Sequence, residues 1–518
     1  MSLLAVDLGT TGVRAVIVTS DGRQIGSGEV EIGLRAPAPG WAEQPAEAFW
    51  QGTVQAVRSA LAQAAIDPAS IAGIGFSHQR GTFALVDKTG APLHDFVVWM
   101  DHRGVPYLDE IRARMEPLSY YDITGVPIYF VSSLSKLVWF ARERPGLVDA
   151  AWRMWPIASV IMARMGVDDP PLDHATATFY GLLDSRSRQW SPEILDRLGL
   201  RADLLPWLAA PGTVAGTLSN PAAAAELGLR LGTPLVLGGG DQQCAALGSG
   251  MIEPGQGLIN LGTATAVMAA VDGPARDTSE IIPSACHALP DQYEMEGHTQ
   301  ASGIVFQRFR DEFAQPEIQV ARQGERSPYD LLVEQASASA PGAGGLVFLP
   351  TFNGTTAPIN FPQGSGALLG LHITHTRADV IRAMLEGMCY ESRWILEHME
   401  AGGTPVRTVY LSGGGSKSPF WCQLHADILQ RPVTRSSTSN AAAVGAAICA
   451  GLGTGIFSSA ADGVRALSRL AETYTPGSDA RQAYGRSFEL FKASYETLYQ
   501  SGLFLKLHDF FSWLQGQG

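Results

Sequence analysis

The sequence lacks several features that would place it in a specialised class of protein. It has only five cysteines among 518 residues, an odd number spread far apart, with no C-x-x-C spacing for a metal or redox site. Basic residues number 37 against 50 acidic ones, which gives a net charge of −13. A nucleic-acid partner is not expected, because binding to phosphate backbones requires clustered Lys and Arg. The sparse cysteines favour a reduced, cytoplasmic protein.

Long hydrophobic runs are also missing, so no membrane partner is expected. No stretch approaches the roughly 20 large apolar residues that span a bilayer. The longest uncharged run, residues 436–461, is mostly Ala, Gly, Ser and Thr. Its larger apolar residues recur every four positions, which is typical of a closely packed buried helix. Residues 1–6 run straight into an apolar strand without a charged leader segment, so a signal peptide is not expected either.

What the sequence does contain is a regular alternation of strand and helix patterns. Its composition is globular, with 46% apolar and 17% charged residues, and at about 150 residues per domain its length suggests two to four domains. Residues 3–6, 13–18 and 24–33 predict a meander of three strands. A helix is predicted at 45–65 and a buried parallel strand at 71–76. The pattern predicts an α/β fold with meander strands added to a parallel core.

The opening segment has an internal echo about half the chain away. Residues 3–11 and residues 258–265 both pass from an apolar strand through Leu-Gly-Thr into a second apolar strand. We therefore predict two related domains, residues 1–249 and residues 250–518, with the turn-rich segment 248–257 as the hinge. Whether the final helix packs back on the first domain is left open.

The first segment suited to chemistry is the turn D-x-G-T-T-x-x-R at residues 7–14. A tight hairpin with glycine and two hydroxyls directs N–H and Oγ atoms at one spot, which suits phosphate. Asp7 at the strand end could hold Mg²⁺, which takes only one or two carboxylates and keeps several waters. Arg14 adds a fixed positive charge. The alternative is an ordinary hairpin with a polar turn.

Two further glycine-rich turns each follow an apolar strand. In residues 234–243 three glycines precede Asp241 at a strand-to-helix junction, where ligands bind in α/β sheets. The alternative for Asp241 is a plain helix N-cap. In residues 408–421 the glycines 413–415 would let a flat ring or a sugar lie against the backbone. This second turn lacks the spacing of a Walker A or dinucleotide motif, and a glycine-rich turn without a ligand is its alternative.

These segments together resemble the FGGY family of carbohydrate kinases over almost the whole chain. The resemblance also covers residues 133–139, the second loop at 262–263 and residues 366–371. It implies an α/β fold of two ribonuclease-H-like, actin-like ATPase domains with a cleft between them. The activity that it implies is ATP-dependent phosphorylation of a small sugar.

The resemblance also implies a role for each matching position. Asp241 stands where the family has the general base that takes the hydroxyl proton, and phosphoryl transfer needs such a carboxylate. Asp7 and Asp241 would place Mg²⁺. The positions implied to bind ATP are Thr10, Thr11, Arg14, Gly262, Thr263, Gly414, Gly415 and Ser418. The positions implied to bind the sugar are Gln79, Arg80, Trp99, Asp101, Arg103 and Gln242.

The sugar loops carry a mixed signature. Residues 99–103 resemble the Trp-x-Asp-x-Arg loop of xylulose kinases, whereas Asp241-Gln242-Gln243 is closer to glycerol kinases. Gly81 stands where glycerol kinases have a glutamate, and no aromatic residue closely follows Thr263. Both changes are expected to enlarge the pocket, which favours a ketopentose. D-xylulose, converted to D-xylulose 5-phosphate, is the first choice, and another ketopentose, a tetritol or glycerol are the alternatives.

An actin-like or chaperone-like ATPase is the alternative from a different class of protein. The sugar loops around Arg80 and residues 99–103, together with Asp241, favour the kinase. The expected partners are therefore a small sugar and ATP. The aromatic stretch 504–514 predicts an amphipathic helix that lies on the body or forms a homodimer contact.

Overall fold

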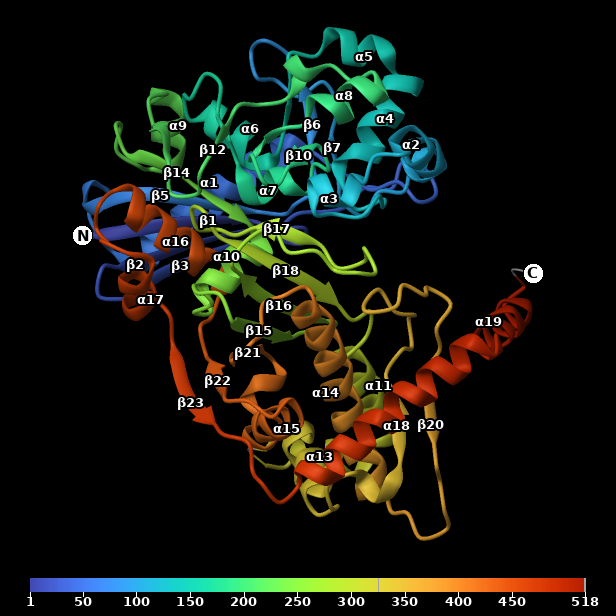
Figure 1. The fold of residues 1–518 in the computed structure, drawn as a ribbon. Coiled ribbons are helices and arrows are strands. Elements are labelled where there is room, and N and C mark those ends of the chain that lie inside the picture. The colour runs from blue at the N-terminus through green and yellow to red at the C-terminus, as the bar shows by residue number, and fades with distance from the viewer. Residues whose placement is uncertain (325, 517–518) are drawn as a thin grey trace.

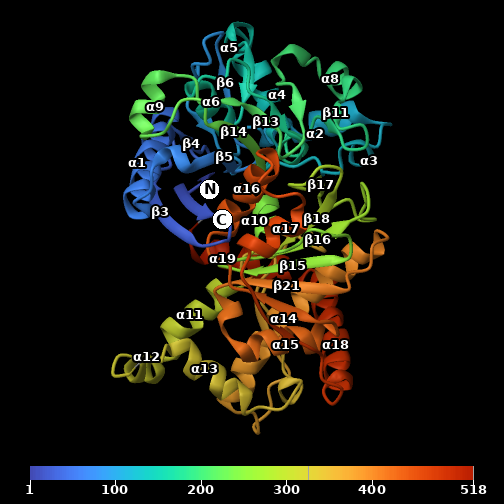
Figure 2. The same cartoon turned by 90° about the vertical axis from the view of Figure 1, so that its left-hand side faces the viewer.

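The computed structural model describes residues 1–324 and 326–516, and it forms two halves, each built on one mixed β-sheet (Figures 1 and 2). The sheet of the N-terminal half has the strand order β13-β14-β5-β1-β2-β3. Its strands are β1 (Ser2–Leu8), β2 (Gly12–Thr19), β3 (Gln24–Glu31), β5 (Ile71–His78), β13 (Val214–Thr217) and β14 (Pro234–Gly240). β1 pairs antiparallel with β2 and parallel with β5, and β5 also pairs parallel with β14.

The strands of this sheet are apolar because helices cover both of its faces. Side chains alternate along a strand, so Leu4 and Val6 pack on one side with helix α1 (Ala46–Ala64). Leu3 and Ala5 pack on the other side with helix α16 (Ala441–Gly453). The predicted buried helix in residues 436–461 is therefore confirmed, and it covers the sheet of the N-terminal half.

The sheet of the C-terminal half repeats the same plan, with the strand order β17-β18-β16-β15-β21-β22-β23. Its strands are β15 (Gln256–Leu261), β16 (Thr265–Val271), β17 (Ser284–Cys286), β18 (Tyr293–His298), β21 (Thr408–Gly413), β22 (Val433–Ser436) and β23 (Leu470–Tyr474). β15 pairs antiparallel with β16 and parallel with β21, as β1 does with β2 and β5. The echo between residues 3–11 and 258–265 thus marks the opening hairpin of each sheet.

Helices α10 (Asp241–Gly248) and α16 lie against each other where the halves meet. Their contact is close because glycines line it: a Cβ atom at Gly445 would lie 1.9 Å from the carbonyl oxygen of Cys244. α10 also packs through Ala246 on Leu258 and Met268 of the second sheet. Each helix therefore covers the sheet of the other half of the chain.

The remaining elements surround the two sheets. In the N-terminal half the helices are α2 (Leu108–Met115), α3 (Tyr120–Thr124), α4 (Ser133–Glu143), α5 (Pro145–Ala150), α6 (Ile157–Arg164), α7 (His174–Thr178), α8 (Pro192–Leu198) and α9 (Pro221–Leu227). In the C-terminal half they are α11 (Gly303–Phe313), α12 (Gln315–Ala321), α13 (Pro328–Ser337), α14 (Arg377–Ala401), α15 (Pro419–Leu429), α17 (Ala460–Leu467), α18 (Arg481–Gln500) and α19 (Leu503–Leu514). Short strands pair outside the main sheets: β4 (Glu43–Gln44), β6 (Ala84–Val86), β7 (Phe96–Val97), β8 (Arg153–Trp155), β9 (Leu172–Asp173), β10 (Leu183–Asp184), β11 (Gln189–Trp190), β12 (Leu208–Ala209), β19 (Val347–Leu349) and β20 (Ala367–Leu369).

The aromatic C-terminal stretch forms the predicted helix, α19, which continues from the end of α18 and projects to the side of the molecule (Figure 1). Phe504 is buried against Tyr495 of α18, whereas Phe510, Phe511 and Trp513 are exposed. Among the described residues, no helix is both long enough and apolar enough to span a bilayer.

Candidate active site

The first phosphate loop joins β1 to β2 and places Asp7 between two polar neighbours. Asp7 lies opposite Arg14 across the hairpin and opposite Ser77 on β5. The Ser77 hydroxyl donates a hydrogen bond of 2.9 Å to Asp7 Oδ1, and Arg14 donates one of 2.5 Å to Glu29. Burial, and then the nearby Asp241 carboxylate, raise the pKa of Asp7 to about 6. The end of the hairpin therefore carries a carboxylate within range of a second one.

Asp241 comes to this place because β14 lies beside β5 in the sheet. Gly240, the last residue of β14, is in register with His78, the last residue of β5. Asp241 then opens α10 with its side chain 28% exposed. The capping position of α10 is Gly240, so the N-cap alternative for Asp241 is not what the structure has. Burial raises the pKa of the Asp241 carboxyl, and the Arg80 guanidinium opposes that rise.

Arg80 connects the two halves of the site. Its Nε atom lies 3.5 Å from Asp241 Oδ1, and its guanidinium stacks 4.0 Å over the ring of Phe179. Two further hydrogen bonds, of 2.5 and 2.7 Å, join its Nη atoms to the two carboxylate oxygens of Glu296 on β18. The stem of Arg80 passes over Gly240, where a Cβ atom would lie 2.4 Å from Arg80 Cδ. The third glycine before Asp241 therefore makes room for this arginine.

The pKa shifts of Arg80 and Glu296 both favour the charged form despite burial. Glu296 is 2% exposed, and burial alone would raise its pKa, but Arg80 and His298 outweigh burial and hold the pKa well below its ordinary value. Burial likewise works against the charge on Arg80, yet Glu296 and then Asp241 raise the pKa of the guanidinium further. His298 also contacts Glu296 through its Nε2 atom.

Gln79 and Trp99 are both brought to the first phosphate loop. The Thr10 hydroxyl donates to Gln79 Oε1 over 2.9 Å, and the Trp99 indole donates to the same hydroxyl over 3.0 Å. Gln79 itself is 1% exposed and donates to Gln44 over 2.9 Å. The buried Gln79 side chain therefore fixes the Thr10 hydroxyl and, through it, the Trp99 indole. Thr11 is exposed.

Asp101 and Arg103 bind each other and the segment at residues 42–43. Asp101 is fully buried and accepts hydrogen bonds of 2.8 Å from Arg103 Nε and of 2.6 Å from the backbone N–H of Ala42. Arg103 also pairs with Glu43 over 2.6 Å and stacks 4.0 Å over the ring of Trp41. Both side chains have their polar atoms engaged in holding the loop that carries Trp99.

Gly81 does not leave the space that its sequence position suggests. It has a φ of +64°, and a Cβ atom there would lie 2.4 Å from the carbonyl oxygen of Val131. That carbonyl is fixed by Lys136, whose buried Nζ donates to the carbonyls of Phe130, Val131 and Ser132 at 2.7 to 3.1 Å. The expectation that Gly81 enlarges the sugar pocket is therefore wrong, because the backbone near residue 131 fills the space.

The two loops of the C-terminal half that are predicted to bind nucleotide are adjacent because their strands, β15 and β21, are paired. Leu261, which precedes Gly262, is in register with Gly413 at the end of β21. The loop at Gly262 is held by the start of α11, where Ile304 N–H donates to the carbonyl of Thr263 over 3.1 Å. Gly413 has a φ of +85°, and a Cβ atom there would lie 2.5 Å from the carbonyl of Leu261. The two loops therefore begin side by side at Leu261 and Gly413, and Thr263 is exposed.

The end of this glycine loop packs against helix α15 and caps it. A Cβ atom at Gly415 would lie 2.7 Å from the ring of Trp421, whereas Gly414 is exposed. Ser418 is the N-cap of α15, and its hydroxyl accepts a hydrogen bond of 3.3 Å from the N–H of Trp421. Gln242, next to the candidate base, is half-buried and donates its backbone N–H to Asp241 over 2.9 Å.

With this geometry established, comparisons with known proteins identify the family. Residues 2–248 match the N-terminal domain of the FGGY family of carbohydrate kinases, and residues 257–454 match its C-terminal domain. The chain belongs to this family. The resemblance inferred from the motifs is thereby confirmed, and so is the α/β fold of two actin-like domains.

This FGGY kinase is similar to relatives that act on different substrates. It is 32% identical over 508 residues to the autoinducer-2 kinase of Escherichia coli (strain K12), covering 95% of this chain and 94% of that one. It is 29% identical over 491 residues to a gluconokinase of Bacillus licheniformis, with 94% of each chain covered. The solved structure of xylulose kinase from Rhodospirillum rubrum superposes with a TM-score of 0.87 at 26% identity, covering 96% and 99% of the two chains.

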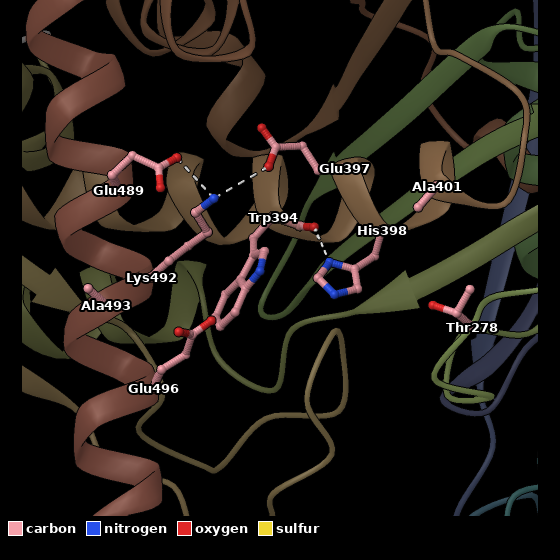
Figure 3. A pocket seen from close by; sticks show the side chains of 9 residues that line it. All are labelled: Thr278, Trp394, Glu397, His398, Ala401, Glu489, Lys492, Ala493 and Glu496. Carbon is pink, nitrogen blue, oxygen red and sulfur yellow. Dashed lines mark hydrogen bonds and ion pairs between the residues drawn. The ribbon is translucent and has the colours of Figure 1, made fainter.

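A cavity of about 470 Å³ lies between α14 and α18 (Figure 3), and none of the predicted site residues lines it. Trp394 and His398 lie at its wall, and Lys492 reaches toward Glu489 at 3.0 Å and toward Glu397 at 3.9 Å. Its charged groups are thus partly paired with one another. Within the described residues, no group of three or more His, Cys, Asp or Glu side chains is arranged to hold a metal ion.

Glu296 is the site residue that the sequence analysis missed. It belongs to the alternating pattern Glu294-Met295-Glu296, in which both acids are buried on β18. Acidic side chains are almost never fully buried without a partner. Two acids within a predicted buried strand could therefore have indicated that this strand pairs with basic groups. The partner itself could not be found from the sequence, because Arg80 lies 216 residues away.

Proposed function

We propose that this FGGY kinase transfers the γ-phosphoryl group of ATP to a hydroxyl group of a small sugar, with Asp241 as the general base. The observation that carries the proposal is the position of Asp241, a partly exposed carboxylate at a strand-to-helix junction beside Asp7 and Arg80. Phosphoryl transfer depends mainly on positioning and charge neutralisation, and a carboxylate accepts the hydroxyl proton as the new bond forms.

The phosphate chain of ATP is proposed to lie between the two hairpin loops. Thr10, Thr11 and Arg14 would face the γ-phosphate, and Gly262 and Thr263 would hold the inner phosphates through backbone N–H groups and a hydroxyl. Adenosine would lie on Gly414 and Gly415. Ser418 would support this loop as the cap of α15, since its hydroxyl already accepts the N–H of Trp421.

Two carboxylates fit the requirements of Mg²⁺, which binds to one or two protein carboxylates together with substrate phosphates and water. Asp7 and Asp241 would hold it between them, directly or through water. When bound, Mg²⁺ supplies positive charge against the phosphate oxygens. Ser77 would keep the Asp7 carboxylate oriented by its 2.9 Å hydrogen bond.

The sugar is proposed to contact Arg80, Trp99 and Gln242. Gln79 would not contact the sugar but would fix the Thr10 hydroxyl and, through it, the Trp99 indole. The buried pair of Asp101 and Arg103 would shape the loop that presents Trp99. This division assigns a contact role to the less buried sugar-loop residues and a supporting role to the buried ones.

The proposed substrate is a small ketose, with D-xylulose as the first choice. The Trp-x-Asp-x-Arg loop at residues 99–103 supports it, as does the superposition on a xylulose kinase of Rhodospirillum rubrum. Autoinducer-2 is the second candidate, because the autoinducer-2 kinase of Escherichia coli is 32% identical over 508 residues.

The test is ADP release with D-xylulose, L-xylulose, D-ribulose, erythritol, glycerol, D-gluconate and autoinducer-2, each measured with and without Mg²⁺. We expect sugar-dependent turnover that requires Mg²⁺ and is fastest with a ketose. Equal ADP release with and without every sugar would indicate an ATPase of the actin-like class instead. Preference for glycerol would retain the kinase and reject the ketose.

A further inference from the structure

Glu296 pairs with Arg80, an arginine that lies next to the proposed general base. Arg80 gives both Nη atoms to the two oxygens of Glu296, at 2.5 and 2.7 Å. Its remaining Nε atom faces Asp241 at 3.5 Å, and one face of the guanidinium is covered by Phe179. Arg80 is thus an arginine whose charge is already matched by carboxylates before any substrate arrives.

Glu296 acts through Arg80 and not by touching the substrate. It is 2% exposed, and it reaches Arg80 from β18, a strand of the opposite half of the chain. His298, which is 42% exposed, shares the same carboxylate. The neighbouring acid Glu294 is occupied elsewhere, since it accepts a hydrogen bond of 2.7 Å from Gln243. Glu296 is therefore a positioning residue for Arg80.

The positive charge of Arg80, beside the proposed sugar position, is already matched by protein carboxylates. Arg80 is paired with Glu296 through both Nη atoms, and its Nε atom lies 3.5 Å from Asp241 Oδ1. A sugar acid would bring another carboxylate next to Glu296 and Asp241, and like charges repel more strongly where water is excluded. An uncharged ketose can still accept hydrogen bonds from the guanidinium edge. Like charges placed against the wrong ligand are a common basis of specificity.

We infer that Glu296 is a specificity-determining residue, which neutralises Arg80 so that the kinase takes an uncharged polyhydroxy substrate and rejects sugar acids such as gluconate. The inference rests on the proposed function, because it places the sugar beside Arg80 and Asp241. It goes further by naming the charge class of the substrate and the residue that selects it.

The experiment compares kcat/KM for D-xylulose and D-gluconate in the wild type and in Glu296→Gln. The wild type is expected to prefer the uncharged sugar by about 100-fold or more, since like charges placed against a ligand strongly suppress its binding. In Glu296→Gln the guanidinium loses its carboxylate partner, so the preference should fall by about tenfold or more. The KM for ATP should change little.

The matched control is Glu317→Gln. Glu317 is also buried and also binds an arginine through both oxygens, with hydrogen bonds of 2.6 and 2.9 Å to Arg377, but it lies on α12 away from the kinase loops. Loss of that pair should lower the melting temperature and leave the sugar preference unchanged. A preference that is unchanged in Glu296→Gln as well would overturn the inference.

Direct binding separates this inference from the proposed function. Titration calorimetry of both sugars, without ATP, should show gluconate binding gained in Glu296→Gln and lost again in Arg80→Gln/Glu296→Gln, because the free guanidinium is then gone. If gluconate binds no better to Glu296→Gln than to the wild type, the inference is wrong whether or not any sugar is phosphorylated. If the wild type prefers gluconate, the inference is wrong and the kinase assignment stands.

If Glu296→Gln does not fold, Glu296→Asp provides a second test, because it keeps the charge on a shorter side chain. This variant should retain the preference for the uncharged sugar, and loss of that preference would count against the inference.

Discussion

The two halves of the molecule open with the same hairpin but place different charges on it. Asp7 on β1 lies opposite Ser77 on β5, and Asn260 on β15 lies opposite Ser412 on β21. Each serine hydroxyl donates to the side-chain oxygen opposite, at 2.9 Å in the first half and 3.2 Å in the second. The second strand of each hairpin then differs, because Asp7 faces Arg14 whereas Asn260 faces Ala266.

The two hairpins share the same backbone pairing but differ in the charge that they carry. The first hairpin gathers ionisable groups, and its Asp7 carboxyl has a raised pKa because it is buried and, to a smaller extent, because the Asp241 carboxylate is nearby. The second hairpin offers a neutral amide together with the glycine backbone at Gly262 and Gly413. Under the proposed function, the first half performs the reaction and the second half holds a nucleotide without adding negative charge near its phosphates.

The largest effect is expected from Asp241→Asn. This substitution removes the carboxylate at the first residue of α10. The facing helix α16 begins at Ala441 and has no acidic residue in its first turn. Loss of a general base lowers turnover by about 10²–10⁴-fold. ADP release at saturating sugar measures the loss, and calorimetric ATP binding serves as the control. Turnover above a few per cent of the wild type would remove Asp241 from the role of base.

A smaller loss is expected from Asp7→Asn, which gives the first hairpin the amide of the second. Even residues that only support a metal ligand change metal affinity by about 10–100-fold, so we expect the Mg²⁺ concentration for half-maximal activity to rise at least about tenfold. Ser77 can still donate to the new amide oxygen, so the fold should be kept. Unchanged Mg²⁺ dependence would show that Asp7 does not hold the ion.

The converse change, Asn260→Asp, should have a weaker effect confined to the nucleotide. A carboxylate there would repel the phosphates of ATP by about 1 kcal/mol, which corresponds to a roughly fivefold higher KM for ATP. The KM for the sugar should stay the same. Steady-state kinetics with each substrate varied in turn distinguishes the two, and an equal rise in both KM values would contradict the assignment of the second hairpin to ATP.

The smallest effect on activity is expected from Glu391→Gln, although stability should respond. Buried charges of the first half have partners, such as Asp101 with Arg103, but within the described residues Glu391 Oε2 on α14 has none. Burial raises the pKa of Glu391 to about 8. The folded state therefore keeps a proton that the unfolded chain loses near pH 4.5, so stability attributable to this group falls as pH rises from about 4.5 to 8.

Thermal unfolding at pH 5, 7 and 9 tests the prediction for Glu391. The glutamine variant should gain stability over the wild type as pH rises, with kcat unchanged at each pH. A difference in melting temperature that does not depend on pH would mean that the carboxyl finds a partner in solution.

Local patterns in the sequence predicted the framework of both halves. The strands expected at residues 3–6, 13–18 and 71–76 are the buried cores of β1, β2 and β5, and the helix expected at 45–65 is α1. These elements follow from the spacing of apolar residues, which depends on near neighbours. The glycine turns before Asp241 were found for the same reason, since tight backbone geometry leaves a mark on the local sequence.

The parts that could not be predicted depend on contacts between distant segments. The ion pair of Arg80 and Glu296 joins the two halves, and the carbonyl of Val131 that excludes a side chain at Gly81 comes from another loop. Asp101 was expected at the sugar, but whether a carboxylate faces a ligand or an arginine two residues away is decided by side-chain packing. Sequence motifs indicate which residues gather near a site, and packing decides which of them remain free to bind.

The crossed arrangement of α10 and α16 means that neither half can fold as an autonomous unit. A fragment ending near residue 249 would lack α16, and the face of its sheet formed by Leu3 and Ala5 would be open to water. A fragment beginning near residue 250 would lack α10 and expose Leu258 and Met268. We therefore expect the two halves to depend on each other for folding, because each covers an apolar sheet face of the other.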